Sequence, residues 1–139
     1  MWTKSYSKTV EKLTAAQVWA VWTDVNQWHQ WQDDIEYAKL DGEFEKGSVI
    51  LFKPKGGPKI KLEVTAVEPD SVFVDLTRFP LARMFDSHEL IDHGDKLEIK
   101  STIRIEGPLS FLWKKIVAEN VANGLEAQTE RLIEKVRNG

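Results

Sequence analysis

Polar and apolar residues alternate at the start of the chain, and this period of two predicts a strand from about Thr3 to Val10. The period then becomes that of a helix, which Thr14 can cap. Apolar residues recur in this helix at Val18, Trp19, Val21 and Trp22. Asp24 can cap a second, shorter helical turn that carries Trp28 and Trp31. The chain is therefore predicted to open with one strand and two short helices.

From about Glu36 onward the period returns to two. Residues typical of turns then interrupt the pattern at Gly42, Gly47, 54–58, 68–70, 79–80 and 93–94. The runs between these breaks have the length of ordinary strands. We therefore expect six consecutive strands joined as a meander.

The last segment has the pattern of a helix that begins at Gly107 and Pro108. Its apolar stripe consists of Leu109, Leu112, Trp113, Ile116, Val117, Val121, Leu125, Leu132 and Val136. A helix of about 29 residues would be roughly 43 Å long and could cross a whole sheet. Gly124 lies inside it and costs about 1 kcal/mol relative to alanine, so we expect a close contact or an open space beside this glycine.

The order of predicted elements is one strand, two short helices, six strands and one long helix. Runs of strands followed by a helix indicate an α+β fold in which the helix covers one face of an antiparallel sheet. The chain has 139 residues and no repeat or linker composition, so we interpret residues 1–139 as a single domain.

The composition excludes several classes of function. Lys and Arg number 19 against 22 Asp and Glu, so no strong positive field is available for nucleic acid. The absence of cysteine excludes disulfides, thiol catalysis and thiolate metal sites. The first ten residues do not form a signal peptide, and no apolar run approaches about 18 residues. We therefore expect a cytoplasmic protein without stable membrane insertion.

Several motifs occupy positions typical of one superfamily: residues 14–25, Trp28, Trp31, Gly42, Gly47, 67–69 and 107–109. Over essentially its whole length, the chain resembles the polyketide cyclase/dehydrase branch of the START-like (SRPBCC) superfamily. The resemblance implies a helix-grip fold, in which a seven-stranded antiparallel sheet curls around a long C-terminal helix and leaves an apolar cavity between them. One departure is residues 14–16, where the family commonly has a proline before the helix. These motifs mark turns and core, and they say little about chemistry.

A two-residue turn at 93–94 would set the register of the last two strands. The predicted cross-strand pairs are Asp92 with Asp95, Leu90 with Leu97, His88 with Ile99, Asp86 with Ser101 and Met84 with Ile103. This face carries most of the aliphatic residues and should therefore look toward the helix. It would bring Asp86, His88 and Ser101 into an otherwise apolar interior.

This polar cluster has three interpretations. It could orient a polar group of a bound ligand, or Asp86 and His88 could form an acid/base pair. The simpler interpretation is a buried histidine that its neighbours satisfy, because an unpaired buried polar group costs about 1–3 kcal/mol.

No cofactor or metal is expected from the spacing of residues. His88 and His93 are five positions apart and would point to opposite faces of a strand, and His29 lies far away in the chain. The sequence has no phosphate-binding loop and no serine nucleophile elbow. Four lysines, Lys53, Lys55, Lys59 and Lys61, surround the Gly56-Gly57 hairpin, and a solvated outer face explains them.

Our leading hypothesis is a module that binds a small hydrophobic ligand in an apolar cavity between the sheet and the C-terminal helix. The expected apolar lining is Trp31, Ile50, Phe52, Leu62, Val64, Val74, Met84, Ile103, Trp113, Ile116 and Val117. The groups expected to orient the ligand by hydrogen bonds are Asp86, His88, Ser101 and Asn120.

The alternative is an enzyme of the polyketide cyclase/dehydrase type, as some relatives are, with His88 or Asp86 as the acid/base. A third possibility is a groove for a protein partner, as in some co-chaperones of similar fold, although nothing in the sequence identifies that partner.

Overall fold

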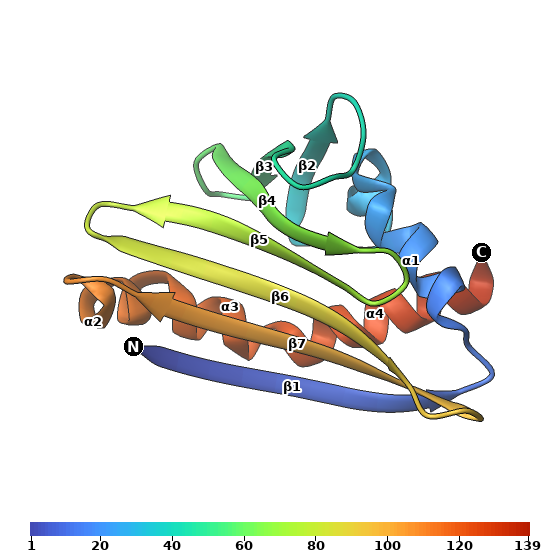
Figure 1. Ribbon diagram of the computed structural model, residues 1–139. Helices are drawn as coiled ribbons and strands as arrows, with labels where there is room; N and C mark the ends of the chain where they lie inside the picture. The colour runs from blue at the N-terminus through green and yellow to red at the C-terminus, as the bar shows by residue number, and fades with distance from the viewer.

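Seven antiparallel strands form one sheet in the computed structural model, which describes residues 1–139. The strands are β1 (Trp2–Glu11), β2 (Ile35–Leu40), β3 (Val49–Pro54), β4 (Ile60–Glu68), β5 (Val72–Phe79), β6 (Ala82–Asp92) and β7 (Lys96–Glu106). Their order across the sheet is β1-β7-β6-β5-β4-β3-β2, so the chain runs as a meander from β2 to β7 and β1 joins its last strand. Figure 1 shows the C-terminal helical segments crossing one face of the sheet along β6, β7 and β1. The predicted α+β helix-grip architecture is confirmed.

Two short helices follow β1, as predicted: α1 (Ala15–Thr23) and the 3₁₀ helix η1 (Val25–Gln30). Thr14 caps α1, because its Oγ1 accepts the N–H of Gln17 at 3.2 Å while Gln17 Oε1 accepts the N–H of Thr14 at 2.9 Å. The prediction that Asp24 caps the second helix is wrong for its side chain, which makes no capping bond. Its backbone carbonyl accepts the N–H of Gln27 at 3.1 Å instead.

The C-terminal helix is long but divided, whereas the sequence pattern predicts one continuous helix. Its segments are α2 (Ser110–Trp113), the π-helical turn η2 (Lys114–Ala118), α3 (Glu119–Asn123) and α4 (Leu125–Asn138). In η2 the N–H of Glu119 bonds to the carbonyl of Lys114, which is the wide hydrogen bond of a π turn. At Gly124 the N–H bonds back to Val121 at 3.1 Å, and the α-helical ladder is interrupted. None of the helices is both long and apolar enough to cross a bilayer.

Open space lies beside Gly124, which is one of the two possibilities expected from the sequence. A Cβ at this position would meet only two backbone carbonyls of the preceding turn, those of Val121 at 3.5 Å and Asn120 at 3.9 Å. Both are ordinary contact distances, so the sheet does not approach the helix here. The backbone has φ −89° and ψ −5°, a conformation open to any residue.

The predicted register of β6 and β7 is wrong by two positions. Asp92 lies opposite Leu97 and His88 lies opposite Ser101, because the two-residue turn is Gly94-Asp95, closed by the His93 N–H on the Lys96 carbonyl at 2.9 Å. Gly94 takes φ +93° at the first central position, which a turn one residue earlier would have assigned to a histidine. A shift of two keeps every side chain on its predicted face, so the polar cluster still faces the helix.

All but one of the buried apolar residues fall into two separate clusters. The larger cluster packs α1, η1 and α4 on the sheet and includes Val18, Trp22, Phe73, Leu132 and Ile133. The smaller cluster lies under the first part of the C-terminal helix and includes Met84, Ile103, Ile105, Ala118 and Ala122. Members of both clusters line one cavity, so the interior is not filled continuously from end to end.

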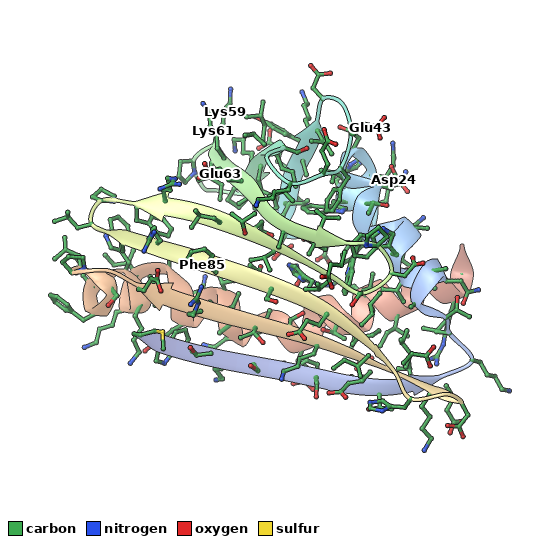
Figure 2. All side chains as sticks on the ribbon, viewed as in Figure 1. Asp24, Glu43, Lys59, Lys61, Glu63 and Phe85 are labelled. Atoms are coloured by element: carbon green, nitrogen blue, oxygen red, sulfur yellow. The ribbon has the colours of Figure 1, made fainter.

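The lysines around the β3–β4 hairpin lie outside this interior. Lys59, just before β4, and Lys61 on β4 are exposed and project away from the C-terminal helix in Figure 2, near Glu63. Lys53 forms an ion pair with Glu36 on the neighbouring strand at 2.7 Å. This arrangement agrees with the solvated outer face expected from the sequence.

Candidate functional site

A cavity of about 540 Å³ lies between the inner face of the sheet and the C-terminal helical segments. This volume lies within the usual range for sites that bind small molecules. Of its 29 lining residues, 15 are hydrophobic, and they come from the strands, from η1 and from the helix. The wall is therefore mainly apolar, with a limited set of polar groups.

The lining residues that are also exposed mark the opening of the cavity. On one side they are Ile116, Asn120 and Gly124 along the helix, and on the other side Asp34 before β2 and Pro58 in the β3–β4 hairpin. Ile116 is 56% exposed although it lines the cavity. The opening therefore lies between the hairpin and the divided part of the helix.

A cluster of polar side chains lies on the inner face of the central strands. Asp75 on β5 is directly opposite Asp86 on β6, and His88 lies two residues further along β6, opposite Ser101 on β7. His88 Nε2 is 3.2 Å from Asp86 Oδ1 and 3.7 Å from Asp75 Oδ2. The side chains of His88, Asp86 and Asp75 are only 10%, 18% and 7% exposed.

Aromatic rings enclose the imidazole. Phe73 stacks on His88 with ring centroids 4.4 Å apart and planes inclined by 22°. The ring of Trp22 is 5.6 Å away at a steeper angle. Because aromatic faces attract cations, these rings favour the protonated, positively charged form of the His88 imidazole.

Hydrogen bonding within the cluster is incomplete. Asp86 Oδ1 is buried and has no hydrogen-bond partner, although His88 Nε2 lies 3.2 Å away. The 3.7 Å between His88 Nε2 and Asp75 Oδ2 is beyond hydrogen-bond distance. Two buried carboxylates thus share one nearby cation without a well-formed bond to it.

The electrostatics favour an imidazolium between the two carboxylates. Burial lowers the pKa of His88, but the charges of Asp86 and Asp75 outweigh this effect and raise the pKa to about 10. Burial raises the pKa of Asp75 to about 6, against the opposing effect of His88. At neutral pH, His88 is therefore protonated and Asp75 is largely ionised.

Asp75, Asp86 and His88 are also the residues that could hold a metal ion, since their donor atoms lie within 4.8 Å of one another. Sequence spacing could not reveal this set, because Asp75 comes from a different strand. A metal would have to displace the proton of His88, and the raised pKa makes this displacement unfavourable at neutral pH.

Ten of the fifteen residues expected to bind a ligand lie on the cavity wall: Trp31, Phe52, Leu62, Met84, Asp86, His88, Ser101, Ile116, Val117 and Asn120. Their part in binding stays a prediction.

The other five expected residues do not line the cavity. Three are enclosed in the core, with exposures of 0–1%: Ile50, Val64 and Ile103. Val74 lies on the outer face of β5, because its neighbours Phe73 and Asp75 occupy the inner face. Trp113 packs behind the wall, where it stacks on Phe79 at 4.6 Å and donates its Nε1–H to the Pro80 carbonyl at 2.9 Å.

Sequence reasoning missed the contribution of β5. Phe73, Asp75 and Thr77 all line the cavity. Each face of β5 carries both apolar and polar residues, so the hydrophobic pattern alone does not show which face points inward. Arg78 could have done so, because it shares a face with Val74 and is exposed, where it pairs with Glu63 at 2.6 Å.

Other missed wall residues come from outside the central strands and include Trp22, Trp28, Gln32, Gln128 and Thr129. Trp28 donates its Nε1–H to the Trp22 carbonyl at 2.9 Å, which fixes η1 against α1. Gln128 donates to Gln32 Oε1 at 3.2 Å and thereby joins the helix to the loop that follows η1.

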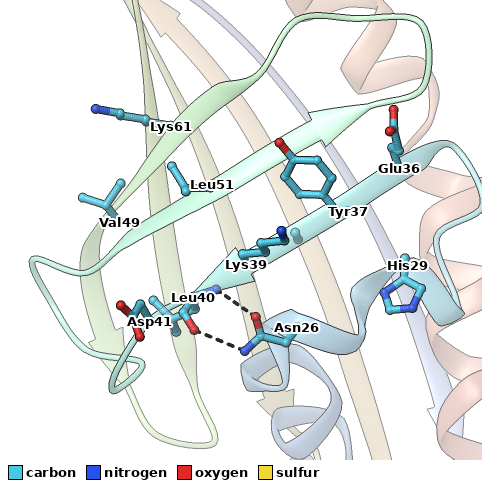
Figure 3. A pocket seen from close by; sticks show the side chains of 11 residues that line it. Asn26, His29, Glu36, Tyr37, Lys39, Leu40, Asp41, Val49, Leu51 and Lys61 are labelled. Carbon is cyan, nitrogen blue, oxygen red and sulfur yellow. Dashed lines mark hydrogen bonds between the residues drawn. The ribbon is translucent and has the colours of Figure 1, made fainter.

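A second hollow of about 980 Å³ lies on the outer side of β2 and β3. Figure 3 shows its wall, in which the Asn26 side chain bonds both backbone groups of Leu40 at 3.1 and 3.2 Å. Tyr37, Leu51 and Lys61 line another part of the same hollow. The hollow is a surface groove without a buried ionisable group. The inner cavity, which is enclosed and contains such groups, is therefore the candidate site.

Several solved structures share this fold. A hypothetical protein from Helicobacter pylori superposes with a TM-score of 0.76 at 14% identity, over 96% of this chain and 87% of the other. Norcoclaurine synthase from Thalictrum flavum superposes with a TM-score of 0.72 at 15% sequence identity, over 99% of this chain and 88% of the other. A START superfamily protein from Mycobacterium smegmatis superposes with a TM-score of 0.68 at 17% sequence identity, over 96% of this chain and 97% of the other. At these identities the likeness establishes the fold alone.

A search of curated proteins gave no match. A family model described as polyketide cyclase / dehydrase and lipid transport matches residues 1–137. This match covers nearly all of the chain and agrees with the resemblance inferred from its motifs. The protein therefore belongs to the polyketide cyclase / dehydrase and lipid transport family.

Proposed function

We propose that the protein binds a small lipophilic molecule in the cavity between the sheet and the C-terminal helix. The observation that carries this proposal is the mainly apolar cavity of about 540 Å³, which lies where the core is divided. An apolar ligand gains about 25 cal/mol for each Å² of apolar surface that it buries, less the cost of association. Micromolar affinity is the expected order.

The wall residues have two roles in this proposal. Phe52, Leu62, Met84 and Val117 supply apolar contact. A second group, Asp86, His88, Ser101 and Asn120, orients the ligand through hydrogen bonds. Such a division is typical of small-molecule sites, where a few polar groups determine the orientation of a mainly apolar ligand.

The enzyme alternative with His88 as the acid/base is not favoured. Efficient proton transfer needs a group whose pKa lies near the working pH. The carboxylates of Asp86 and Asp75 raise the pKa of His88 to about 10, so this imidazole retains its proton at neutral pH.

The test compares two variants that carry the same substitution. Val117→Phe places a larger side chain in the cavity, whereas Val49→Phe adds the same group at an exposed position on β3. The probe is the neutral fluorophore N-phenyl-1-naphthylamine. We expect micromolar binding to the wild type, at least tenfold weaker binding to Val117→Phe and unchanged binding to Val49→Phe.

Circular dichroism and thermal unfolding establish that both variants are folded. Equal affinity of the folded Val117→Phe variant and the wild type would place the ligand elsewhere and overturn the proposal. Absence of binding to the wild type would do the same.

A further inference from the structure

The cavity wall is unusual in the sign of its charges. Its ionisable residues are Asp34, Asp75, Asp86 and His88, and none of its 29 residues is a lysine or arginine. With all four groups in their charged forms, the three carboxylates contribute −3 and the imidazolium +1, so the wall has a formal net charge of −2. The chain as a whole has 19 Lys and Arg residues, all of which lie off this wall.

The negative charges lie both at the entrance and in the interior. Asp34 is exposed at the start of β2 and belongs to the outer part of the wall. Asp75 and Asp86 face each other across β5 and β6 in the interior. A ligand that enters the cavity therefore meets negative charge along its path.

The inner carboxylates also lack donors. Asp86 Oδ1 is buried without a hydrogen-bond partner, and the Asp75 side chain, 93% buried, comes no closer than 3.7 Å to His88 Nε2. A buried charge without hydrogen bonds is strongly unfavourable, and the single N–H that His88 presents cannot satisfy both carboxylates. What the cluster needs is a further donor that carries positive charge.

We propose that the ligand is a lipophilic amine, whose protonated nitrogen binds between Asp75 and Asp86 while its apolar body fills the cavity. The inference rests on the proposed function and specifies the class of molecule. An ammonium group supplies three N–H donors and one positive charge, which match the two carboxylates. The aromatic rings of Trp22 and Phe73, which already enclose the imidazolium of His88, favour a cation in the same region.

The same charge count argues against ligands with an acidic head group. A fatty acid or a phosphorylated lipid would bring another anion beside Asp75 and Asp86, with no lysine or arginine on the wall to neutralise it. An alcohol is an intermediate case, since it donates one hydrogen bond and brings no charge.

The test uses three probes that share one aromatic body: 1-naphthylmethylamine, 1-naphthylmethanol and 1-naphthoate. Affinities for the wild-type protein are measured at pH 7 by displacement of N-phenyl-1-naphthylamine. We expect the amine to bind at least tenfold more tightly than the alcohol, and the carboxylate to bind most weakly. This comparison needs no variant, so it stands even where a substitution impairs folding.

Variants then locate the amine. Asp86→Asn and Asp75→Asn are expected to weaken amine binding at least tenfold while leaving the alcohol within about twofold of the wild type. Asp95→Asn, in the exposed β6–β7 turn, is the matched control and should change neither affinity.

The outcomes separate this inference from the proposed function. If the three probes bind alike, or the carboxylate binds best, the amine inference fails while lipophilic binding stands. If neither the fluorophore nor any of the three probes binds, the proposed function fails as well. Stoichiometric binding of Zn²⁺ that displaces the amine and is lost in Asp75→Asn would overturn the inference in favour of a metal site on the same residues.

Discussion

His88 is the residue whose environment departs most from that of an ordinary core residue. It is nearly buried, it stacks on Phe73 and it carries its charge between two carboxylates. Ionised groups are rarely buried without a reason, and strongly shifted pKa values are commonest at functional sites. These features support the proposal that the cluster belongs to a binding site.

The raised pKa of His88 predicts how stability depends on pH. The folded protein holds this proton up to a pH of about 10, whereas the unfolded chain releases it near 6.5. The stabilisation is therefore fully present below pH 6.5 and is lost as the pH rises toward 10. Two groups that face the imidazole, Asp75 and Asp86, produce the shift, and the titration of Asp75 near pH 6 lies just below this window.

Urea unfolding of the wild type and of His88→Gln at pH 6.5 and pH 10 measures this effect. The free energy of unfolding of the wild type, relative to that of His88→Gln, should fall by about 1 kcal/mol or more between pH 6.5 and pH 10. Both proteins share every other ionisable group, so the comparison isolates the contribution of His88. A difference that stays constant with pH would show that His88 is not held as a cation.

At the scale of elements, the divided C-terminal helix determines the shape of the site. The π turn η2 and the break at Gly124 both occur where the helix lines the cavity. α4 also contributes wall residues, such as Gln128 and Thr129, but it is a regular helix anchored in the larger cluster by Leu132 and Ile133. The irregular segments therefore coincide with the part of the helix that borders the opening.

Gly124→Ala tests whether the break at this glycine is needed for stability. A Cβ here meets only carbonyls of the helix itself at ordinary contact distances, and the backbone conformation suits alanine. We expect an increase of about 0.5–1 kcal/mol in the free energy of unfolding, because alanine restricts the unfolded chain more than glycine does. Thermal or urea unfolding measures it, and a loss of stability would mean that the segment needs the freedom of glycine.

Much of this arrangement could be predicted from the sequence, because turns and periodicity are local properties. The order of strands follows from the spacing of the breaks, and the inward face of β6 follows from alternation, so Asp86 and His88 were expected on the cavity side. The register at Gly94 was not predicted correctly, since two adjacent turns were compatible with the same alternation and only backbone φ distinguishes them.

The partner of His88 could not be predicted in the same way. Asp75 reaches the cluster across a β5–β6 pairing, and the mixed faces of β5 made Val74 as plausible an inner residue as Phe73. The division of the helix is also non-local, because a gap between helix and sheet depends on all the side chains that surround it.

At the scale of the whole molecule, the helix covers the sheet unevenly. It crosses β6, β7 and β1, and Figure 1 shows β2, β3 and β4 curving away from it. β7 pairs with β1 and with β6 over nearly its whole length, whereas β3 pairs with β4 only from Val49 to Phe52. The β2–β3 ladder is also irregular between Ile35 and Tyr37.

This asymmetry predicts the pattern of amide hydrogen exchange. Amides in the middle of β6 and β7 should exchange most slowly, through global unfolding, and those of β2 and β3 faster, through local opening. Exchange followed by NMR or mass spectrometry without ligand measures the difference. Equal protection of both regions would mean that the sheet opens only as one unit.

The two separate apolar clusters have a consequence for the amount of native protein. For a protein that binds a guest between them, the guest completes the hydrophobic interior much as an additional side chain would. Folding and occupancy then become one linked equilibrium, and a guest at a hundredfold excess over its Kd adds about 2.7 kcal/mol to the free energy of unfolding. Because chaperones and proteases remove unfolded chains, the cellular level of such a protein rises and falls with the supply of its guest.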